Sequence, residues 1–220
     1  MTLPPDRMIE RIVPWSLNGQ AQAPFLCTPS DLEDLVTGHL LTMGRIVSAG
    51  AILEISVQED RLSVTLHMEA GQERPIDVRL QELAPVRSNS RFVLTDLRQC
   101  ADRLTGTEDY WGTHRLVLHG PQGELFREDI GRHNAADKVI GAAVRQGWTL
   151  GDCALGATGR ISLEILLKAA AAGIPMIFTK KYESDLCARE AERLGIGIAS
   201  KIQGGEPLMS GALWRFMPAG

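Results

Sequence analysis

The sequence has few aromatic residues, four scattered cysteines and no long uninterrupted apolar run. Aromatic side chains make up 5% of the 220 residues. The longest apolar stretch, residues 161–178, contains Glu164 and Lys168 and is broken at Pro175, so it is too interrupted to span a bilayer. Acidic residues and prolines occupy the first positions, where a signal peptide would have its apolar core. We therefore expect a cytoplasmic protein without membrane association.

The chain also lacks an excess of positive charge. The chain has 23 Lys and Arg against 27 Asp and Glu, which gives a formal net charge of -4 and a pI near 5.8. This balance lacks the electrostatic footprint of a nucleic-acid-binding protein, although net charge does not report on a local basic pocket. With 44% hydrophobic and 23% charged residues, the composition is typical of a globular protein with a substantial core.

The cysteines lie far apart, at Cys27, Cys100, Cys153 and Cys187. The sequence has no C-x-x-C and no Cys and His at ligand spacing, which predicts neither a zinc site nor a disulfide framework. The expected state is four reduced, mostly buried thiols. For Cys27, the start of the predicted helix that follows would lower the pKa, whereas its neighbours Phe25 and Leu26 favour a buried apolar side chain.

The first half of the chain mixes helical and strand patterns. Residues 27–46 carry an apolar stripe of helical period and predict a helix capped by Thr28 or Ser30. Alternation over residues 51–68 predicts a β-hairpin, and residues 74–83 predict a further strand. These segments indicate a small α+β portion.

The second half has a more regular rhythm. A short helix over residues 94–104, capped by Thr95, precedes a second hairpin over residues 114–129. From residue 134 onward, helices alternate with short apolar strands, which is the signature of parallel βα units. We therefore predict an α/β fold in which a mixed central sheet has helices on both faces. The expected portions are residues 1–94 (α+β) and 95–220 (α/β), forming one compact unit.

The end of the second hairpin enters a helix through a corner rich in functional groups. Its residues are Glu128, Asp129, Gly131, Arg132, His133 and Asn134. Gly131 permits a positive φ, the free N–H groups of the helix attract anions, and Arg132 offers a planar fork for phosphate. Asp129 has three conceivable roles: capping the helix with an ion pair to Arg132, orienting Arg132 or His133, or accepting from a base or sugar. The corner is interpreted as an anion cradle, with simple helix capping as the alternative.

Three further polar clusters lie beside predicted strands. Their residues are Thr158, Gly159 and Arg160, then His114, then Gly204 and Gly205 within residues 200–211. The first suits a phosphate-facing loop, although Ser162 as an ordinary N-cap explains part of it. His114 is either a site residue or a surface imidazole. Ligands gather beyond the carboxyl ends of strands, so all four clusters are candidates for one site.

Four stretches together resemble the FdhD/NarQ family of formate dehydrogenase accessory sulfurtransferases. They are TPSDLEDLVTGHLLTMGRI, EDIGRHNAADKVIG, GRISLEILLKAAAAGIP and GGEPLMSG, and the likeness runs from about Ala23 to Phe216. It implies a homodimer with a fold similar to cytidine deaminases, a three-layer α/β/α sandwich. It also implies binding of the bis-molybdopterin guanine dinucleotide form of the molybdenum or tungsten cofactor as cargo. A guanine nucleotide should then bind as a partial mimic.

The resemblance also implies a sulfur route. Family members accept sulfur as a persulfide from a cysteine desulfurase and pass it to the cofactor, which formate dehydrogenase receives. The family's cofactor-binding stretch corresponds here to Lys201, Ile202, Gln203, Gly204, Gly205 and Glu206, with Glu206 in place of the usual basic end. The family carries its sulfur on a C-x-x-C loop. The corresponding residues, 82–100, contain no cysteine pair, and Cys100 does not match the persulfide residue.

Three functions follow from these observations. The first is a cofactor-binding accessory protein without sulfur transfer of its own, acting on formate dehydrogenase beside a second thiol-bearing protein. The second is a sulfurtransferase that uses an isolated cysteine. The third is a deaminase-like hydrolase, but the chain lacks the H-x-E and P-C-x-x-C that zinc deaminases need. The missing thiol pair and the retained binding corners favour the first.

Overall fold

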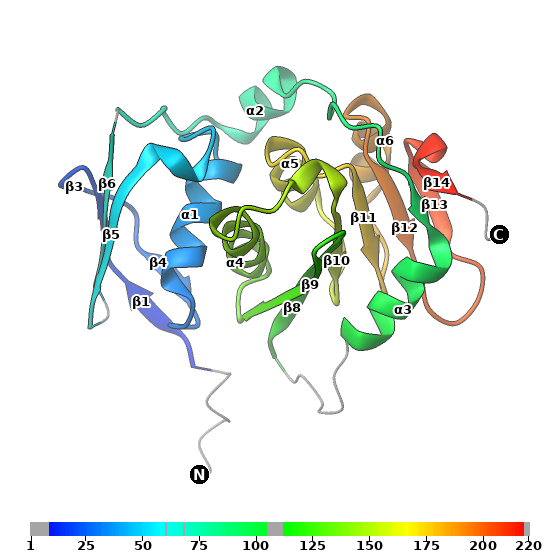
Figure 1. Cartoon of the computed structure of the whole chain (residues 1–220), viewed down its shortest axis with the longest axis horizontal. Coiled ribbons are helices and arrows are strands. Elements are labelled where there is room, and N and C mark those ends of the chain that lie inside the picture. The colour runs from blue at the N-terminus through cyan, green and yellow to red at the C-terminus, as the bar shows by residue number, and fades with distance from the viewer. Residues whose placement is uncertain (1–8, 60, 68, 105–111, 218–220) are drawn as a thin grey trace, which may run out of the picture.

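The computed structural model describes residues 9–59, 61–67, 69–104 and 112–217. Its main sheet is built from β8 (His114–Gly120), β9 (Gly123–Asp129), β10 (Ala154–Ala157), β11 (Met176–Thr179), β12 (Gly197–Ser200) and β13 (Leu208–Gly211). The strand order is β13-β12-β11-β10-β8-β9 (Figure 1). β10, β11 and β12 are mutually parallel, whereas β8, β9 and β13 join by antiparallel pairing, so the sheet is mixed as predicted.

Helices cover both faces of this sheet. They are α3 (Leu94–Leu104), α4 (Arg132–Arg145), α5 (Leu163–Ala171) and α6 (Asp185–Arg193). Side chains alternate along each strand, so Leu116 and Leu118 of β8 join the core beneath α4 and α5. Val117, between them, joins the second core beneath α3. The mixed α/β arrangement predicted from the sequence is confirmed.

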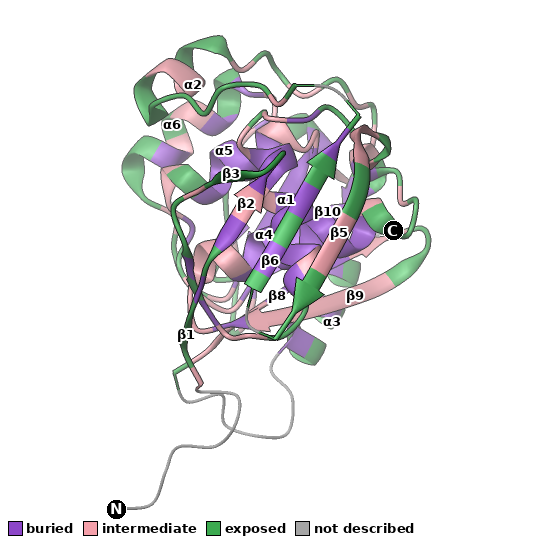
Figure 2. Cartoon of the chain, turned by 90° about the vertical axis from the view of Figure 1, so that its left-hand side faces the viewer, coloured by how far each residue is buried: buried purple, intermediate pink, exposed green. Residues whose placement is uncertain are grey.

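The chain up to β6 adds two small sheets and helix α1. Its elements are β1 (Arg11–Val13), β2 (Trp15–Leu17), β3 (Gln20–Ala21), β4 (Phe25–Cys27), α1 (Leu32–Thr42), β5 (Ile52–Gln58) and β6 (Arg61–Leu66). β1 pairs with β4, and the other strands form the sheet β3-β2-β6-β5, which contains the predicted hairpin. Buried and exposed residues alternate along β6, as Figure 2 shows from the outer side. This alternation buries one face of the sheet.

Two glycines let α1 and α4 approach at backbone distance. A β-carbon at Gly38 of α1 would lie 1.9 Å from the carbonyl oxygen of Asp137. A β-carbon at Gly141 of α4 would lie equally close, 1.9 Å, to the carbonyl oxygen of Asp34. Only glycine fits at either position, and the contact joins the N-terminal portion to the main sheet. One continuous core cluster includes residues on both sides of position 94, and the division into two portions stays a prediction.

Several local predictions are wrong. Residues 74–83 were expected to form a strand, but they contain helix α2 (Ile76–Glu82), whose Leu80 lies against the main core with the following Leu83. This i, i+3 spacing is helical, and Pro75 stands at the N-cap. α1 is not capped by Thr28 or Ser30, because its N-cap residue is Asp31 without a side-chain cap bond.

The cap of α3 also differs from the prediction. The helix begins at Leu94, which places Thr95 inside it. Leu94 directly follows β7 (Phe92–Val93), which pairs with β14 (Phe216–Met217). Single turns of 3-10 helix occupy Ala49–Ala51, Leu150–Asp152 and Leu213–Arg215. None of the helices in the described ranges is both long and apolar enough to cross a membrane.

Candidate functional site

The corner between β9 and α4 is organised around a buried carboxylate. Asp129 is fully buried, and its oxygens accept hydrogen bonds from the backbone N–H of Gly131 at 2.7 Å and of Thr28 at 3.1 Å. Nδ2 of Asn134 donates to the same carboxylate at 3.2 Å and to the carbonyl of Leu26 at 2.6 Å. Asp129 therefore ties the segment before α1 to the start of α4.

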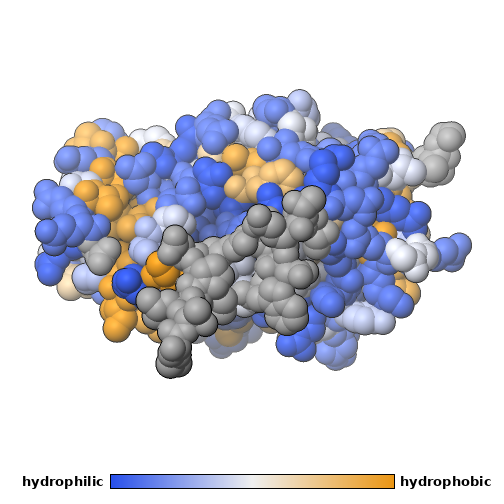
Figure 3. Space-filling view, turned by 90° about the horizontal axis from the view of Figure 1, so that it is seen from below, coloured by the Kyte–Doolittle hydropathy of each residue, from blue (hydrophilic) through white to orange (hydrophobic). Residues whose placement is uncertain are grey.

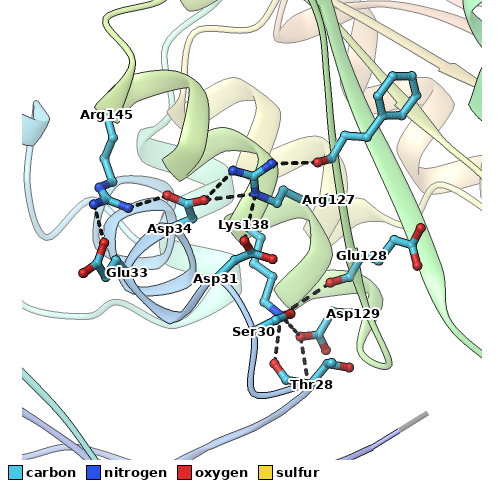
Figure 4. Close-up of polar contacts among 11 residues, drawn as sticks. Thr28, Ser30, Asp31, Glu33, Asp34, Arg127, Glu128, Asp129, Lys138 and Arg145 are labelled. Atoms are coloured by element: carbon cyan, nitrogen blue, oxygen red, sulfur yellow. Dashed lines mark hydrogen bonds and ion pairs between the residues drawn. The ribbon is translucent and has the colours of Figure 1, made fainter. Parts of the chain in front are cut away.

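Lys138 completes this arrangement from the second turn of α4. Its Nζ lies 2.7 Å from Oδ2 of Asp129, and neither side chain is exposed. The same ammonium donates to the carbonyl of Thr28 at 2.9 Å (Figure 4). The prediction of an ion pair between Asp129 and Arg132 is wrong, because the carboxylate of Asp129 pairs with Lys138. Asp129 also does not cap the helix in the usual way, since Gly131 is the N-cap residue and makes no side-chain cap bond.

Gly131 is needed for a different reason from the one predicted. Its φ is -94° and its ψ 121°, an extended conformation open to any residue. A β-carbon there would lie 2.9 Å from Nδ2 of Asn134 and 3.3 Å from Oδ1 of Asp129. The glycine therefore makes room for the carboxylate and the amide to close over the corner.

Arg132 and His133 point from this corner toward the loop after β10. Nη1 of Arg132 donates to the carbonyl of Arg160 at 2.7 Å. Its Nε is shielded from solvent and has no hydrogen-bond partner among the described residues. Nε2 of His133 lies 2.6 Å from Oε2 of Glu164 in α5. Burial lowers the pKa of His133, and the nearby carboxylate of Glu164 opposes this shift.

The loop after β10 meets His114 at the same edge of the sheet. The N–H of Thr158 donates to the carbonyl of Arg115 at 3.1 Å. A β-carbon at Gly159 would lie 3.2 Å from Nδ1 of His114 and 3.6 Å from Cδ of Arg132. His114 itself stands opposite Asp129 in the pairing of β8 with β9. Three of the four predicted clusters therefore converge.

His114 is partly buried at this junction and is not a surface imidazole. Burial lowers its pKa, and the nearby positive charge of Arg132 lowers it further. Its neutral form can donate or accept a hydrogen bond at the mouth of the corner. The cation beside it supplies the charge that an anion would need.

The fourth cluster joins the same edge only in part. The N–H of Ile202 donates to the carbonyl of Thr179, whose hydroxyl donates to the carbonyl of Gly159 at 2.6 Å. The side chain of Ile202 is fully buried in the core beneath α3 and does not face a ligand. Gln203 and Gly205 turn toward α3, where they contact Asp102 and Arg98. Only the start of this cluster lies near the other three.

The glycines of this cluster have the predicted conformation. Gly204 and Gly205 have φ values of 77° and 143°, which favour glycine. Lys201 and Glu206 are exposed. The orange loop containing these residues lies at the lower right of Figure 1.

Sequence reasoning missed a set of residues at the end of β11. Lys181 and Tyr182 are exposed there, and Nζ of Lys201 lies 5.5 Å from the centre of the Tyr182 ring. The backbone N–H of Lys201 donates to the carbonyl of Lys181 at 2.8 Å. Their position directly after a parallel strand was the available signal. The lower side of the molecule is largely hydrophilic around the main sheet, with hydrophobic groups gathered toward the N-terminal sheets (Figure 3).

None of the four cysteines offers an accessible thiol. All are free and buried, at Cys27, Cys100, Cys153 and Cys187. Burial raises the pKa of Cys27 and Cys187 to about 12 and that of Cys153 to about 11. It also raises the pKa of Cys100, whose thiol hydrogen-bonds Glu124. The alternative in which a helix start lowers the pKa of Cys27 is wrong.

Comparisons with known proteins agree on one family. The FdhD/NarQ family matches residues 8–209. The sulfur carrier protein FdhD of Cupriavidus necator is 29% identical over 93% of this chain and 82% of its own length, and that of Geobacillus kaustophilus is 26% identical over 86% and 81%. The crystal structure of a protein described as a formate dehydrogenase accessory protein from Desulfotalea psychrophila is 26% identical with a TM-score of 0.84, over 95% of this chain and 90% of that one. Because the match spans nearly its full length, the chain belongs to the FdhD/NarQ family.

Proposed function

We propose that this protein is a formate dehydrogenase accessory protein that binds the bis-molybdopterin guanine dinucleotide form of the molybdenum or tungsten cofactor. It would support the sulfuration of this cargo or its delivery to formate dehydrogenase in the cytoplasm. The observation that carries the proposal is the junction of Arg132, His114 and Gly159 at one edge of the main sheet. The likeness to proteins named as sulfur carriers and formate dehydrogenase accessory proteins supports it.

The chemistry of this edge suits a phosphorylated ligand. The first turn of α4 presents free backbone N–H groups, and the partial positive charge of a helix start favours anions. Nε of Arg132 is shielded and unpaired among the described residues, so it has a hydrogen bond left to donate. Arg160 and Lys201 add exposed positive charge. A guanine dinucleotide carries the diphosphate that this arrangement would hold.

We assign different roles to the residues of the corner. Arg132, His133, His114, Thr158, Gly159 and Arg160 would contact the cargo, together with Lys201, Gln203, Gly204, Gly205 and Glu206. Asp129, Asn134 and Gly131 would position them, because the carboxylate is buried and its contacts are internal. Glu128 borders a hollow of about 420 Å³ beside β9. Ile202 would contribute only its backbone.

The buried thiols argue against sulfur transfer by this chain itself. A persulfide carrier needs an accessible thiolate, and here burial raises the pKa of every cysteine. We therefore propose that a cysteine desulfurase or a second thiol-bearing accessory protein supplies the sulfur. The alternative, an active sulfurtransferase with one isolated cysteine, is favoured by the sulfur carrier names of the relatives. The proposal also includes a fold like that of cytidine deaminases. It further includes a homodimer, which sedimentation equilibrium would detect.

Guanosine diphosphate titration tests the binding site. Calorimetry should show saturable binding to the wild type, and Arg132→Ala should weaken it by at least about tenfold because a charged hydrogen bond is lost. Arg189→Ala, an exposed arginine on α6, is the matched control and should bind as the wild type does. Unchanged affinity in both Arg132→Ala and His133→Ala would sink the proposed site.

Persulfide formation separates the two functions. The protein is incubated with a cysteine desulfurase and cysteine, and its intact mass is measured without reductant. The accessory function predicts no stoichiometric persulfide. A stoichiometric shift that disappears when one cysteine is replaced would establish the alternative.

A further inference from the structure

Three metal-ligating side chains meet at the turn end of the β8–β9 hairpin. Cys100 comes from α3, His119 from β8 and Glu124 from β9. One ligand atom from each, the thiol sulfur, an imidazole nitrogen and a carboxylate oxygen, lies within 4.8 Å of the other two. The candidate site described above is at the opposite end of the same hairpin, where His114 faces Asp129. The cluster is therefore a separate feature of the molecule.

We propose that Cys100, His119 and Glu124 form a binding site for a divalent transition metal ion, with Zn²⁺ as the preferred ion. One sulfur, one nitrogen and one oxygen are the donors that this borderline ion accepts. Magnesium and calcium prefer oxygen donors only, so the thiol and the imidazole exclude them. The site is independent of the proposed cofactor binding.

The imidazole of His119 has a ring nitrogen available to bind a metal ion. Nδ1 of His119 is shielded from solvent and makes no hydrogen bond to any described residue. It lies 3.3 Å from Oε1 of Glu124, an ion pair only when the imidazole is protonated. A metal ion bound to Nδ1 and the carboxylate would accept the lone pair of Nδ1, which has no other partner among the described residues.

Arg103 orients the carboxylate of Glu124. Its Nε donates to Oε2 of Glu124 at 2.8 Å, and its guanidinium also pairs with Oε1. These contacts hold the carboxylate of Glu124 in place beside His119. An ionised carboxylate has about four lone-pair sites, so it can accept from an arginine and still bind a metal. Arginine would then act as the outer partner that orients a ligand.

The site is open on one side. Cys100 is fully buried, whereas the side chains of His119 and Glu124 are 26% and 16% exposed. A hollow of about 270 Å³ is lined by His119 and by Asp96, one turn before Cys100 in α3. Three protein ligands and a water entering from this hollow would complete a tetrahedral shell.

Metal binding must displace the thiol proton. The Cys100 thiol exchanges its S–H bond for a sulfur–metal bond, and the proton passes to solvent. No oxidation or reduction takes place.

Cobalt titration of the full-length, metal-free protein under reducing conditions tests the proposal. We expect one equivalent of Co²⁺ to produce a thiolate-to-cobalt charge-transfer band that Zn²⁺ then abolishes. His119→Gln should weaken binding by at least about tenfold, and Cys100→Ser should remove the band. Cys187→Ala and His67→Gln change a cysteine and a histidine elsewhere in the molecule. Both control variants should keep the wild-type Co²⁺ affinity and charge-transfer band. Zn²⁺ should also raise the thermal unfolding midpoint of the wild type but not of His119→Gln.

Two results would overturn the proposal. One is a wild-type protein that gives no charge-transfer band with Co²⁺. The other is a Co²⁺ affinity or a zinc-induced stabilisation of His119→Gln equal to that of the wild type. Because His119 is partly exposed, this variant decides the question even if replacement of the buried Cys100 prevents folding.

Discussion

Nζ of Lys138 lies 2.7 Å from Oδ2 of Asp129, and both side chains are completely excluded from solvent. The pair joins two neighbouring elements, the end of β9 and the second turn of α4. Three further donors satisfy the carboxylate, and the ammonium also binds the carbonyl of Thr28. The ion pair therefore fixes the geometry of the corner from which Arg132 and His133 extend.

Replacing Lys138 should strongly destabilise the protein. Lys138→Met leaves Asp129 as a buried, unpaired charge, which costs about 3–5 kcal/mol of unfolding free energy. Urea denaturation measures the loss. Arg189→Met, which removes an exposed ion pair with Asp185, should produce no measurable change. A Lys138→Met variant as stable as this control would contradict the structural role of the pair.

Replacing Gly141 should separate α1 from α4. In Gly141→Ala the new methyl group would lie 1.9 Å from the carbonyl oxygen of Asp34, so the helices must move apart. We expect a loss of about 1–3 kcal/mol or more in urea denaturation, typical of an overpacked core. Gly50→Ala is the control, because its methyl group would meet nothing closer than 3.7 Å. Equal stability of the two variants would exclude the close helix contact.

Lowering the pH should reduce the unfolding free energy of the protein, because Asp137 becomes protonated. Burial alone would raise the pKa of this carboxyl, but Lys168 at 2.7 Å, and then His39, lower it from its usual 3.8 to about 2. Since the folded pKa lies below the unfolded one, the stabilisation is complete above about pH 4 and is lost as the pH falls through 2. It amounts to about 2 kcal/mol.

The double variant Asp137→Asn/Lys168→Met tests this dependence without leaving a charge unpaired. Between about pH 5 and pH 2, its unfolding free energy in urea should fall by about 2 kcal/mol less than that of the wild type. Asp185→Asn, an exposed carboxyl, should behave as the wild type does. Identical acid profiles for the double variant and the wild type would show that Asp137 is not responsible.

The cysteines should be unreactive in the folded protein. With pKa values raised to about 11 or above, as for Cys27, Cys153 and Cys187, the thiolate fraction at about pH 8 is lower by a factor of about a hundred or more than for a free cysteine. Colorimetric thiol titration should detect no fast-reacting group in buffer and four in denaturant. One fast thiol in the folded protein would instead identify an accessible sulfur carrier.

Much of the secondary structure could be predicted from the sequence, because hydrophobic period and turn residues are local properties. The hairpin over residues 114–129 and the helices after it follow from such patterns. The prediction was wrong at α2, where the short segment from Ile76 to Glu82 is too brief for its period to be decisive. In the structure Leu80 and Leu83, three residues apart, both pack against the main core.

The candidate site could be predicted in part. Its strand-end positions follow from the α/β pattern, since the carboxyl ends of parallel strands meet at one edge. The positions of Arg132 after β9 and of Gly159 after β10 agree with this rule, whereas His114 reaches the same edge from the amino end of the antiparallel strand β8. The pairing inside the corner was not predicted, because only the nearby Arg132 was expected as the partner of Asp129, whereas the fold places Lys138 beside the buried carboxylate.

The sequence by itself determined the main helices and strands after residue 94, the absence of a thiol pair and the presence of an acid–glycine–cation corner. Only the tertiary structure decided that Lys138 neutralises Asp129, and that Cys100 meets His119 and Glu124. The physical reason is that local propensities act over a few residues, whereas partners and burial depend on which elements come together in space. A buried carboxylate such as Asp129 needs a neighbouring positive charge, and the fold determines which cation lies close enough to supply it.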